Sequence, residues 1–156
     1  MTRAWTLRCV LVVLFWLVGT ANAAAQAAPS CTISATAVAF GNYNVYSVTN
    51  VDSTGTITYR CNAAAANISI TLSKGASSTF SPRTLRKGAE ALNFNLYRNA
   101  ARTQIWGDGT GGTSVLSVAN PPNNQSVNVT VFGRIPALQD VSAGSYSDTV
   151  VATVNF

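Results

Sequence analysis

Apolar and polar residues alternate with a period of two along most of the chain after position 31, which is the pattern of half-buried β-strands. The clearest segment is 67–73, in which isoleucine and leucine alternate with serine and threonine. Shorter or looser versions of the pattern predict strands at 33–40, 56–61, 92–97, 104–106, 115–118 and 127–131. The residues expected to face a core in the three best-defined segments are Ile57, Tyr59, Cys61, Ile68, Ile70, Leu72, Leu92, Phe94 and Leu96.

Turn-forming residues separate these segments, and no window keeps the 3.6-residue period of an amphipathic helix. The alanine run 63–66 is compatible with one helical turn, but asparagines bracket it between two of the strands. About seven short strands divided by Gly, Asn, Ser and Pro clusters are typical of a β-sandwich. The pattern therefore predicts an all-β sandwich.

The last segment, 144–156, keeps the alternation up to the final residue of the sequence. Its apolar face would present Tyr146, Val150, Ala152, Val154 and Phe156. Its polar face would present Ser147, Thr149, Thr153 and Asn155. Because no residue follows in this sequence, we expect no later segment to pair with this strand. Its edge is then either covered by an earlier strand or left open to a strand from another chain.

Residues 1–23 have the pattern of a secretory signal peptide: two arginines, a short apolar run at 9–18 and the small-residue cleavage pattern at 21–23. Cleavage after a second such pattern, 25–27, fits equally well. A lone membrane anchor is the alternative, but the apolar run is short for a hydrocarbon layer of about 30 Å. We therefore expect an exported chain with one mature domain, 24–156, and no membrane insertion after signal cleavage.

The charge of the chain is modestly basic, with ten basic and five acidic residues. Loss of two arginines with the signal would leave eight basic residues against the five acids. The one basic cluster consists of Arg83, Arg86 and Lys87, and no aromatic residues interleave with it. We therefore predict a solvated loop there and no nucleic-acid partner.

Two cysteines, Cys31 and Cys61, lie beyond the expected signal. An even number of cysteines in an exported chain predicts one intramolecular disulfide. Two free thiols or a metal pair are the alternatives, but the sequence has no histidine that could complete a zinc site. Closing a loop of about 30 residues would stabilise the fold by about 3–4 kcal/mol in the chain-entropy model.

The sequence offers little for catalysis. Without histidine, nucleophiles of the Ser-His and Cys-His kind cannot be built. The five acids are isolated from one another in sequence, so nothing indicates the carboxylate pair of a glycosidase. We expect no catalytic residues and no enzyme.

A glycine-rich stretch, 107–112, matches the spacing G-x-G-x-x-G. A dinucleotide site would need a helix to open directly after it, but the following residues 113–118 are strand-like. We predict a hairpin loop, with Trp106 packed onto the sandwich at its start. Asp108 alone offers too few ligands for calcium, so neither a cofactor nor a metal is expected.

Three segments carry a family resemblance. The first is Cys-Thr-Ile-Ser at 31–34 together with Val-Ala-Phe-Gly-Asn-Tyr at 38–43. The second, at 96–113, contains the unusual run Trp-Gly-Asp-Gly-Thr-Gly after a Leu-Tyr strand. The third is Ala-Gly-Ser-Tyr-Ser-Asp-Thr-Val at 143–150. Together they resemble the spore coat protein U domain family, which includes the pilins of the archaic (Csu-type) chaperone–usher pathway.

This resemblance implies an immunoglobulin-like sandwich that lacks its final strand. In the pilus-forming members a periplasmic chaperone lends a strand, and the N-terminal extension of the next subunit replaces it at an outer-membrane usher. The partners implied here are therefore a chaperone, an usher and other pilin subunits, reached after export to the periplasm and cell surface. The strand-acceptor groove would lie beside the apolar face of 144–156.

One feature departs from the family pattern. A donor segment needs about ten or more alternating apolar residues before the first cysteine, whereas 24–30 offers alanines and Pro29. Alanine contributes much less burial than valine or leucine, at about 25 cal/mol per Å². The chain is thus expected to accept a strand more readily than it gives one, either at a terminal position of a fibre or in a surface coat that never polymerises.

The leading hypothesis is a secreted, non-enzymatic structural subunit of a bacterial surface fibre or coat, assembled by strand donation and supporting adhesion or biofilm formation. The alternative is a self-complete secreted β-sandwich that acts as a coat or ligand-binding module without polymerising.

Overall fold

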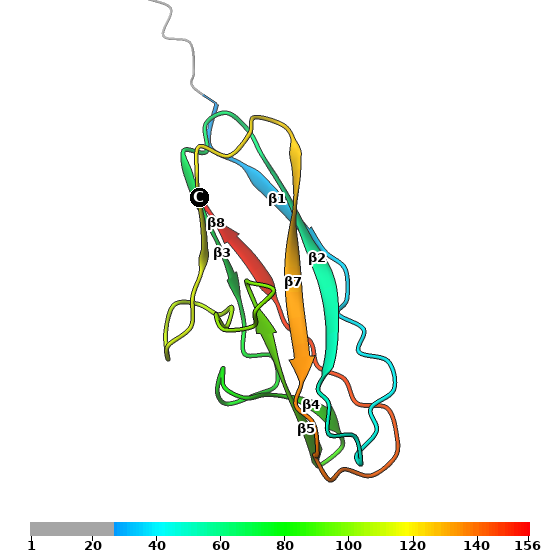
Figure 1. The fold of residues 1–156 in the computed structure, drawn as a ribbon. Coiled ribbons are helices and arrows are strands. Elements are labelled where there is room, and N and C mark those ends of the chain that lie inside the picture. The colour runs from blue at the N-terminus through cyan, green and yellow to red at the C-terminus, as the bar shows by residue number, and fades with distance from the viewer. Residues whose placement is uncertain (1–26) are drawn as a thin grey trace, which may run out of the picture.

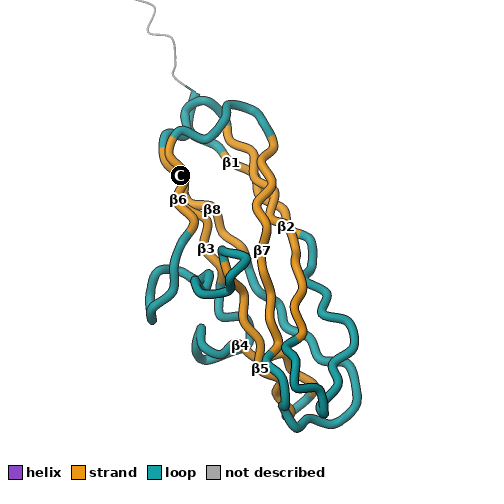
Figure 2. Tube along the Cα trace, viewed as in Figure 1, coloured by secondary structure: helices purple, strands orange, loops and turns teal. Residues whose placement is uncertain are grey.

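The structure of the protein is a computed structural model that describes residues 27–156, so the expected signal peptide, 1–23, lies outside the described residues. Over 27–156 the chain forms strands joined by loops and turns, with no helix (Figure 2). The described residues accordingly include no helix that is long and apolar enough to cross a membrane.

Eight strands form two layers (Figure 1). Their bounds are β1 (Cys31–Ala35), β2 (Val51–Cys61), β3 (Asn67–Leu72), β4 (Arg83–Lys87), β5 (Glu90–Tyr97), β6 (Leu116–Ala119), β7 (Ser126–Ile135) and β8 (Ala152–Asn155). One sheet has the order β1-β2-β7-β5-β4, and the other has the order β6-β3-β8. All ladders between these strands are antiparallel. The all-β sandwich predicted from the alternating pattern is confirmed.

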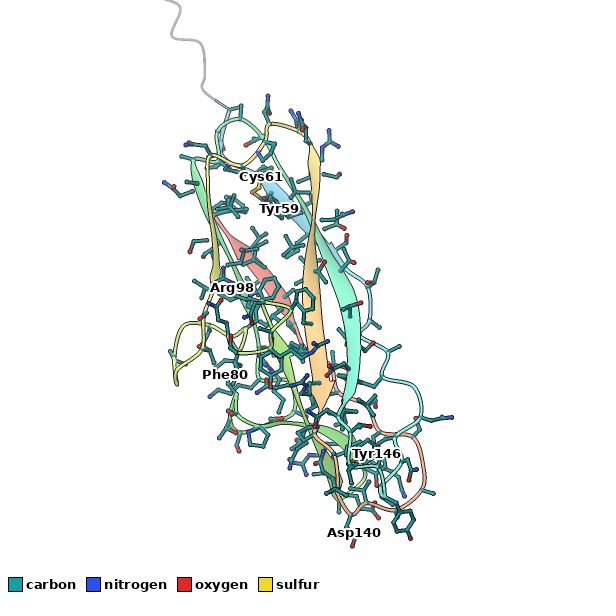
Figure 3. All side chains as sticks on the ribbon, viewed as in Figure 1. Tyr59, Cys61, Phe80, Arg98, Asp140 and Tyr146 are labelled. Atoms are coloured by element: carbon teal, nitrogen blue, oxygen red, sulfur yellow. A yellow bond between two sulfur atoms is a disulfide. The ribbon has the colours of Figure 1, made fainter. Side chains whose placement is uncertain are left out.

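The core lies between the two sheets and is built from the inward positions of each strand. Every inward residue predicted from 56–61, 67–73 and 92–97 is buried, because a strand places alternate side chains on opposite faces. Figure 3 shows two of them, Tyr59 and Cys61, between the sheets at one end of the molecule. The predicted packing of Trp106 is also confirmed, since its side chain is fully buried in this core.

The predicted solvated loop around Arg83 is wrong, because Arg83–Lys87 is the strand β4 and the Arg83 side chain is fully buried. Three neutral acceptors replace the water around its guanidinium. Nε donates to Ser73 O at 3.0 Å, one terminal nitrogen donates to Asn95 Oδ1 at 2.7 Å, and the other donates to Trp106 O at 2.6 Å. A buried cation is tolerated when, as here, each of its three nitrogen atoms donates to an acceptor.

Two predicted strands are shorter than the alternation indicated. The first strand ends at Ala35, after which the chain leaves its neighbour and passes over the inner face of β2 and β7. The last segment is a regular strand only over Ala152–Asn155. The predicted strand at 104–106 forms only isolated bridges, one between Ile105 and Tyr97 and one between Trp106 and Ser114.

Candidate functional site

The two layers are not closed along one side of the sandwich. β1 is the terminal strand of the five-stranded sheet, and β8 is the terminal strand of the three-stranded sheet. Cα atoms of β1 and β8 approach within 8 Å of each other, yet no ladder joins the two strands. Paired strands lie about 4.7–4.9 Å apart. Within residues 27–156, therefore, both strands keep one edge that no other strand pairs.

A groove of about 330 Å³ opens on this side, and we refer to it as the β1–β8 groove. One wall is the stretch 35–38 with Phe40, and the other is 148–150 with Ala152. The floor consists of apolar core residues, namely Ile57, Leu72, Leu85, Phe94, Leu96 and Val131. These floor residues belong to the core, and apart from Leu85 they are buried, from 1% exposed for Ile57 to 6% for Leu96.

A second hollow of about 900 Å³ continues the groove toward the β4–β5 end of the molecule, and we refer to it as the distal depression. Its walls are 37–45 and 141–148, and it includes Leu92 and Ile135. The two hollows share lining residues, namely Ala37, Val38, Phe40, Leu85 and Asp148. The two hollows therefore adjoin each other, the first lined mainly by apolar side chains and the second by a mixture of apolar and polar groups.

The first wall depends on two glycines that let the chain lie close to the sheet. A Cβ built on Gly133 would lie 2.6 Å from Val38 Cγ1 and 2.7 Å from Phe40 Cζ. A Cβ on Gly55 would lie 2.8 Å from Val38 Cγ2 and 2.9 Å from the backbone oxygen of Thr36. Because both glycines point inward, the wall packs directly on the sheet and takes the space that side chains would otherwise fill.

The second wall is a segment that changes sheets, 147–151, which we name the crossover segment. At its start Ser147 exchanges two backbone hydrogen bonds with Arg86 of β4, at 2.8 and 3.1 Å. At its end Val151 accepts from Ser73 N at 2.9 Å, and its own N–H donates to Ser73 Oγ at 2.9 Å. From Ala152 onward the chain pairs with β3. This change of partner strand explains why the predicted strand is interrupted. Apolar and polar residues nevertheless continue to alternate through the interruption.

A polar cluster fixes the far end of the second wall to the β4–β5 turn. Glu90 accepts hydrogen bonds from the hydroxyls of Tyr146 and Ser142, and Lys87 Nζ lies 3.7 Å from its carboxylate. These donors, the Tyr146 hydroxyl first, lower the pKa of Glu90 to about 2. The same bond to Glu90 raises the pKa of Tyr146. In Figure 3 Tyr146 lies at the end of the molecule opposite Cys61.

The disulfide between Cys31 and Cys61 is present, and it joins directly opposed residues of β1 and β2. The chain just before it is also held in place. Asn62 N donates to Ser30 O at 2.9 Å, and the Asn62 side chain accepts from Ser30 N at 3.1 Å and donates to Ala28 O at 2.8 Å. The first edge of the groove is thereby fixed at its N-terminal end.

The five residues predicted to line an acceptor groove separate into three groups. Val150 and Ala152 line the β1–β8 groove, and Tyr146 lines the distal depression. Val154 is half-buried against the core, opposite Ile70 in the β3–β8 ladder. Phe156 lies beyond β8 with 54% of its surface exposed, so the structure does not bring it to the groove.

The floor, the first wall and Asp148 were not predicted as parts of the groove. The floor residues have the same inward periodicity as the rest of the core, so their sequence pattern does not show which core residues line a groove. One sequence feature could have indicated the first wall. The side chains of Val38 and Phe40 pack where inward-facing glycines on two other strands leave space. Within residues 27–156, no group of three or more Cys, Asp or Glu side chains gathers where a metal could bind.

This geometry defines a class of protein, namely an immunoglobulin-like β-sandwich with a groove between two unpaired edges. The family model of the Spore Coat Protein U domain matches residues 17–153, and the chain belongs to that family. Protein U of Myxococcus xanthus is 35% identical over 131 residues, which cover 75% of this chain and 70% of that protein.

A solved structure is also similar. It is the crystal structure of the CsuC–CsuE chaperone–tip adhesion subunit pre-assembly complex from the archaic chaperone–usher Csu pili of Acinetobacter baumannii. The match has a TM-score of 0.54 at 26% identity and covers 82% of this chain. The present chain spans 40% of the solved chain.

Proposed function

We propose that this protein is an exported, non-enzymatic structural subunit of a chaperone–usher surface fibre, and that its β1–β8 groove takes a strand from another chain. The observation that carries the proposal is the groove itself: β1 and β8 each keep an unpaired edge, and the segments next to them, 35–38 and 148–150, face each other across an apolar floor. Edge strands with free N–H and C=O groups are templates for strand addition.

A donated strand would contribute in two ways. Its backbone would pair with a free edge, that of β1 or that of β8, which supplies affinity with little dependence on sequence. Its inward side chains would pack against floor residues such as Phe94 and Val131, which are each 4% exposed in the free protein, and would themselves become buried. Each fully buried valine or leucine side chain would contribute about 1.5–3 kcal/mol.

The likeness to a chaperone–subunit complex supports a chaperone as the first strand donor and a fellow subunit as the second. The signal-like N-terminus supports export to the periplasm, and passage through an usher to the cell surface completes the proposal. A role in adhesion or biofilm formation follows from a place in such a fibre. The alanine-rich segment 24–30 favours a subunit that accepts a strand but donates one poorly, as at a terminal position.

The second candidate is a secreted coat protein that does not polymerise. Its support is the 35% identity to Protein U and the family's description as a spore coat domain. In that case the groove stays unfilled by other chains, and the hydrogen bonds of the crossover segment give its edge enough order to remain soluble.

Binding of a synthetic strand distinguishes the two candidates. The probe is a fluorescein-labelled peptide of about ten residues in which valine and threonine alternate, with lysines at both ends for solubility. Fluorescence anisotropy against the purified mature protein should show saturable binding. A second peptide with the sequence of 24–30 should bind more weakly, because alanine methyl groups fill the floor badly.

Charge substitutions locate the bound peptide. Val150→Asp and Val154→Asp each place a carboxylate on the apolar side, where desolvation is costly without a partner, and should abolish peptide binding and surface export. Val151→Asp is the matched control, because Val151 lies on the same segment with 57% of its surface exposed. A monomeric, stable protein whose β8 edge is protected from hydrogen exchange and which binds neither peptide would favour the coat protein instead.

A further inference from the structure

Asp148 contributes a side-chain contact of its own to the second wall of the groove. This residue lines both the β1–β8 groove and the distal depression, so it stands where the two meet. Its carboxylate lies in the turn 73–77, which is the first part of the link between β3 and β4. There Oδ1 accepts from Ala76 N at 2.8 Å and from its neighbour Thr149 N at 2.8 Å.

The turn has room for this carboxylate only because residue 75 is glycine. A Cβ built on Gly75 would lie 2.0 Å from Asp148 Oδ2 and 2.5 Å from its Cγ, far inside any allowed contact. Gly75 also has a φ of +65°, a conformation that favours glycine. Asp148 Oδ2 is buried in this niche and accepts no hydrogen bond from any described residue.

The same turn connects the niche to the buried cation of the core. Ser73 bonds Val151 of the crossover segment through its backbone N–H and its hydroxyl, and its carbonyl oxygen accepts from Arg83 Nε. Burial lowers the pKa of Arg83 to about 10, while the carboxylates of Asp148 and Asp108 act in the opposite direction. Arg83 makes no ion pair within 4 Å among residues 27–156, so Asp148 offsets its charge from a distance.

We propose that Asp148 is a positioning residue whose carboxylate, seated in the niche at Gly75, holds the crossover segment as a wall of the β1–β8 groove and thereby sets the affinity of the groove for a strand. The inference rests on the proposed strand-accepting function. In this proposal the carboxylate of Asp148 fixes the point at which the chain passes from the edge of β4 to the edge of β3. When this contact is lost, the segment keeps its apolar residues but no longer presents Val150 and Ala152 at a fixed distance from β1.

Four variants test the role of the niche. Gly75→Ala fills the niche and strains the backbone, whereas Gly88→Ala strains a residue of similar φ, +58°, with nothing within 4 Å of the new methyl group. Asp148→Ala removes the carboxylate, and the double variant Gly75→Ala/Asp148→Ala removes the collision together with the contact. The probe is the alternating valine–threonine peptide described above.

We expect Gly75→Ala and Asp148→Ala each to weaken peptide binding by about tenfold, since hydrogen bonds to a charged group are lost in both. Gly88→Ala should bind like the parent protein. The double variant should bind no worse than Asp148→Ala, and it keeps the test valid if Gly75→Ala alone does not fold. Binding at the parent affinity in both Asp148→Ala and the double variant, with only their unfolding midpoints lowered, would reduce Asp148 to a purely structural role and overturn the proposal.

Hydrogen exchange of the free protein provides a readout that does not depend on the peptide. The backbone amides of Val151 and Ala152 should exchange faster in Asp148→Ala than in the parent and remain unchanged in Gly88→Ala. If the parent protein binds no peptide, the strand-accepting function fails, while faster exchange at these two amides still supports the positioning role. Unchanged exchange in Asp148→Ala would contradict the positioning role, whether or not the parent binds.

Discussion

Single side chains join parts of this sandwich that are distant in sequence, and Trp106 is the largest of them. It is fully buried, and its Nε1 donates to Ile70 O of β3 at 2.9 Å. Its backbone N–H donates to Leu96 O of β5 at 2.9 Å, so one residue links both sheets. A substitution here acts on the core and on two backbone acceptors together.

Trp106→Ala should lower the free energy of unfolding by about 3–5 kcal/mol, because it leaves a large cavity. Trp106→Phe should cost less, since most of the ring volume remains and mainly the bond to Ile70 is lost. Urea unfolding followed by far-ultraviolet circular dichroism measures both. An unchanged midpoint for Trp106→Ala would show that this residue does not hold the two sheets together.

Glu90 makes the loop at the end of the second wall sensitive to acid. Its pKa is about 2 in the folded protein, below the ordinary value of 4.5, so its contacts favour folding above pH 4.5 and this contribution is lost as the pH falls toward 2. Tyr146 has a raised pKa, so its contribution is present below pH 10 and is lost at higher pH.

We expect Glu90→Gln to flatten the dependence of the unfolding midpoint on pH between about 4.5 and 2. Asp140→Asn, on a neighbouring exposed loop residue with no ion pair among residues 27–156, serves as the control. An acid profile of Glu90→Gln that matches the parent would mean that the Tyr146–Glu90 contact contributes nothing to stability.

At the scale of elements, the first wall lies on the sheet only where β2 and β7 carry glycine. Gly133→Ala should push Val38 and Phe40 away and cost about 1–3 kcal/mol, as overpacking usually does. Adding Val38→Ala should recover part of this loss, because the new methyl group then meets a smaller side chain. Gly55→Ala should not be relieved by Val38→Ala, since its methyl group also meets the backbone oxygen of Thr36 at 2.9 Å.

Thermal unfolding of these single and double variants gives the comparison directly. Equal recovery by Val38→Ala in both glycine backgrounds would contradict the difference between a side-chain contact and a backbone contact.

The sequence predicted the strands best where a segment with alternating residues stays paired in one sheet along its whole length. In β3, the inward residues Ile68 and Ile70 follow directly from the period of two. The interruption of the last strand did not follow, because alternation records the face of a strand but not the sheet that its backbone joins. The burial of Arg83 was equally hidden, since its acceptors on Ser73, Asn95 and Trp106 are brought together only by the fold.

The sequence predicted a groove beside the last segment, and its use as a strand acceptor stays a prediction. Val150 and Ala152 were found from the apolar face of the last segment, whereas the floor and the first wall come from strands with ordinary core patterns. The niche at Gly75 lies 73 residues before Asp148 in the sequence, and no local pattern connects the two.

At the scale of the whole molecule, the unpaired edges of β1 and β8 should make the isolated protein self-associate. We expect the apparent mass in light scattering after size-exclusion chromatography to rise with protein concentration. An excess of the alternating valine–threonine peptide should return it toward the monomer. A mass that stays monomeric at every concentration, with or without peptide, would indicate that the groove is closed in solution.

The cross-strand disulfide also determines how tension would travel through the molecule. A pull on residues 27–30 reaches Cys31, the first residue of β1, and passes through the covalent bond to Cys61, the last residue of β2. At Cys61 the load divides between Asn62, the next residue of the chain, and β2, which is paired with β7 over ten residue pairs, from Val51 to Arg60. Because the bonds of the β1 ladder lie beyond the covalent junction, they are not peeled apart one after another. A subunit pulled through its N-terminal residues would thus not open by the unzipping of its edge strand β1.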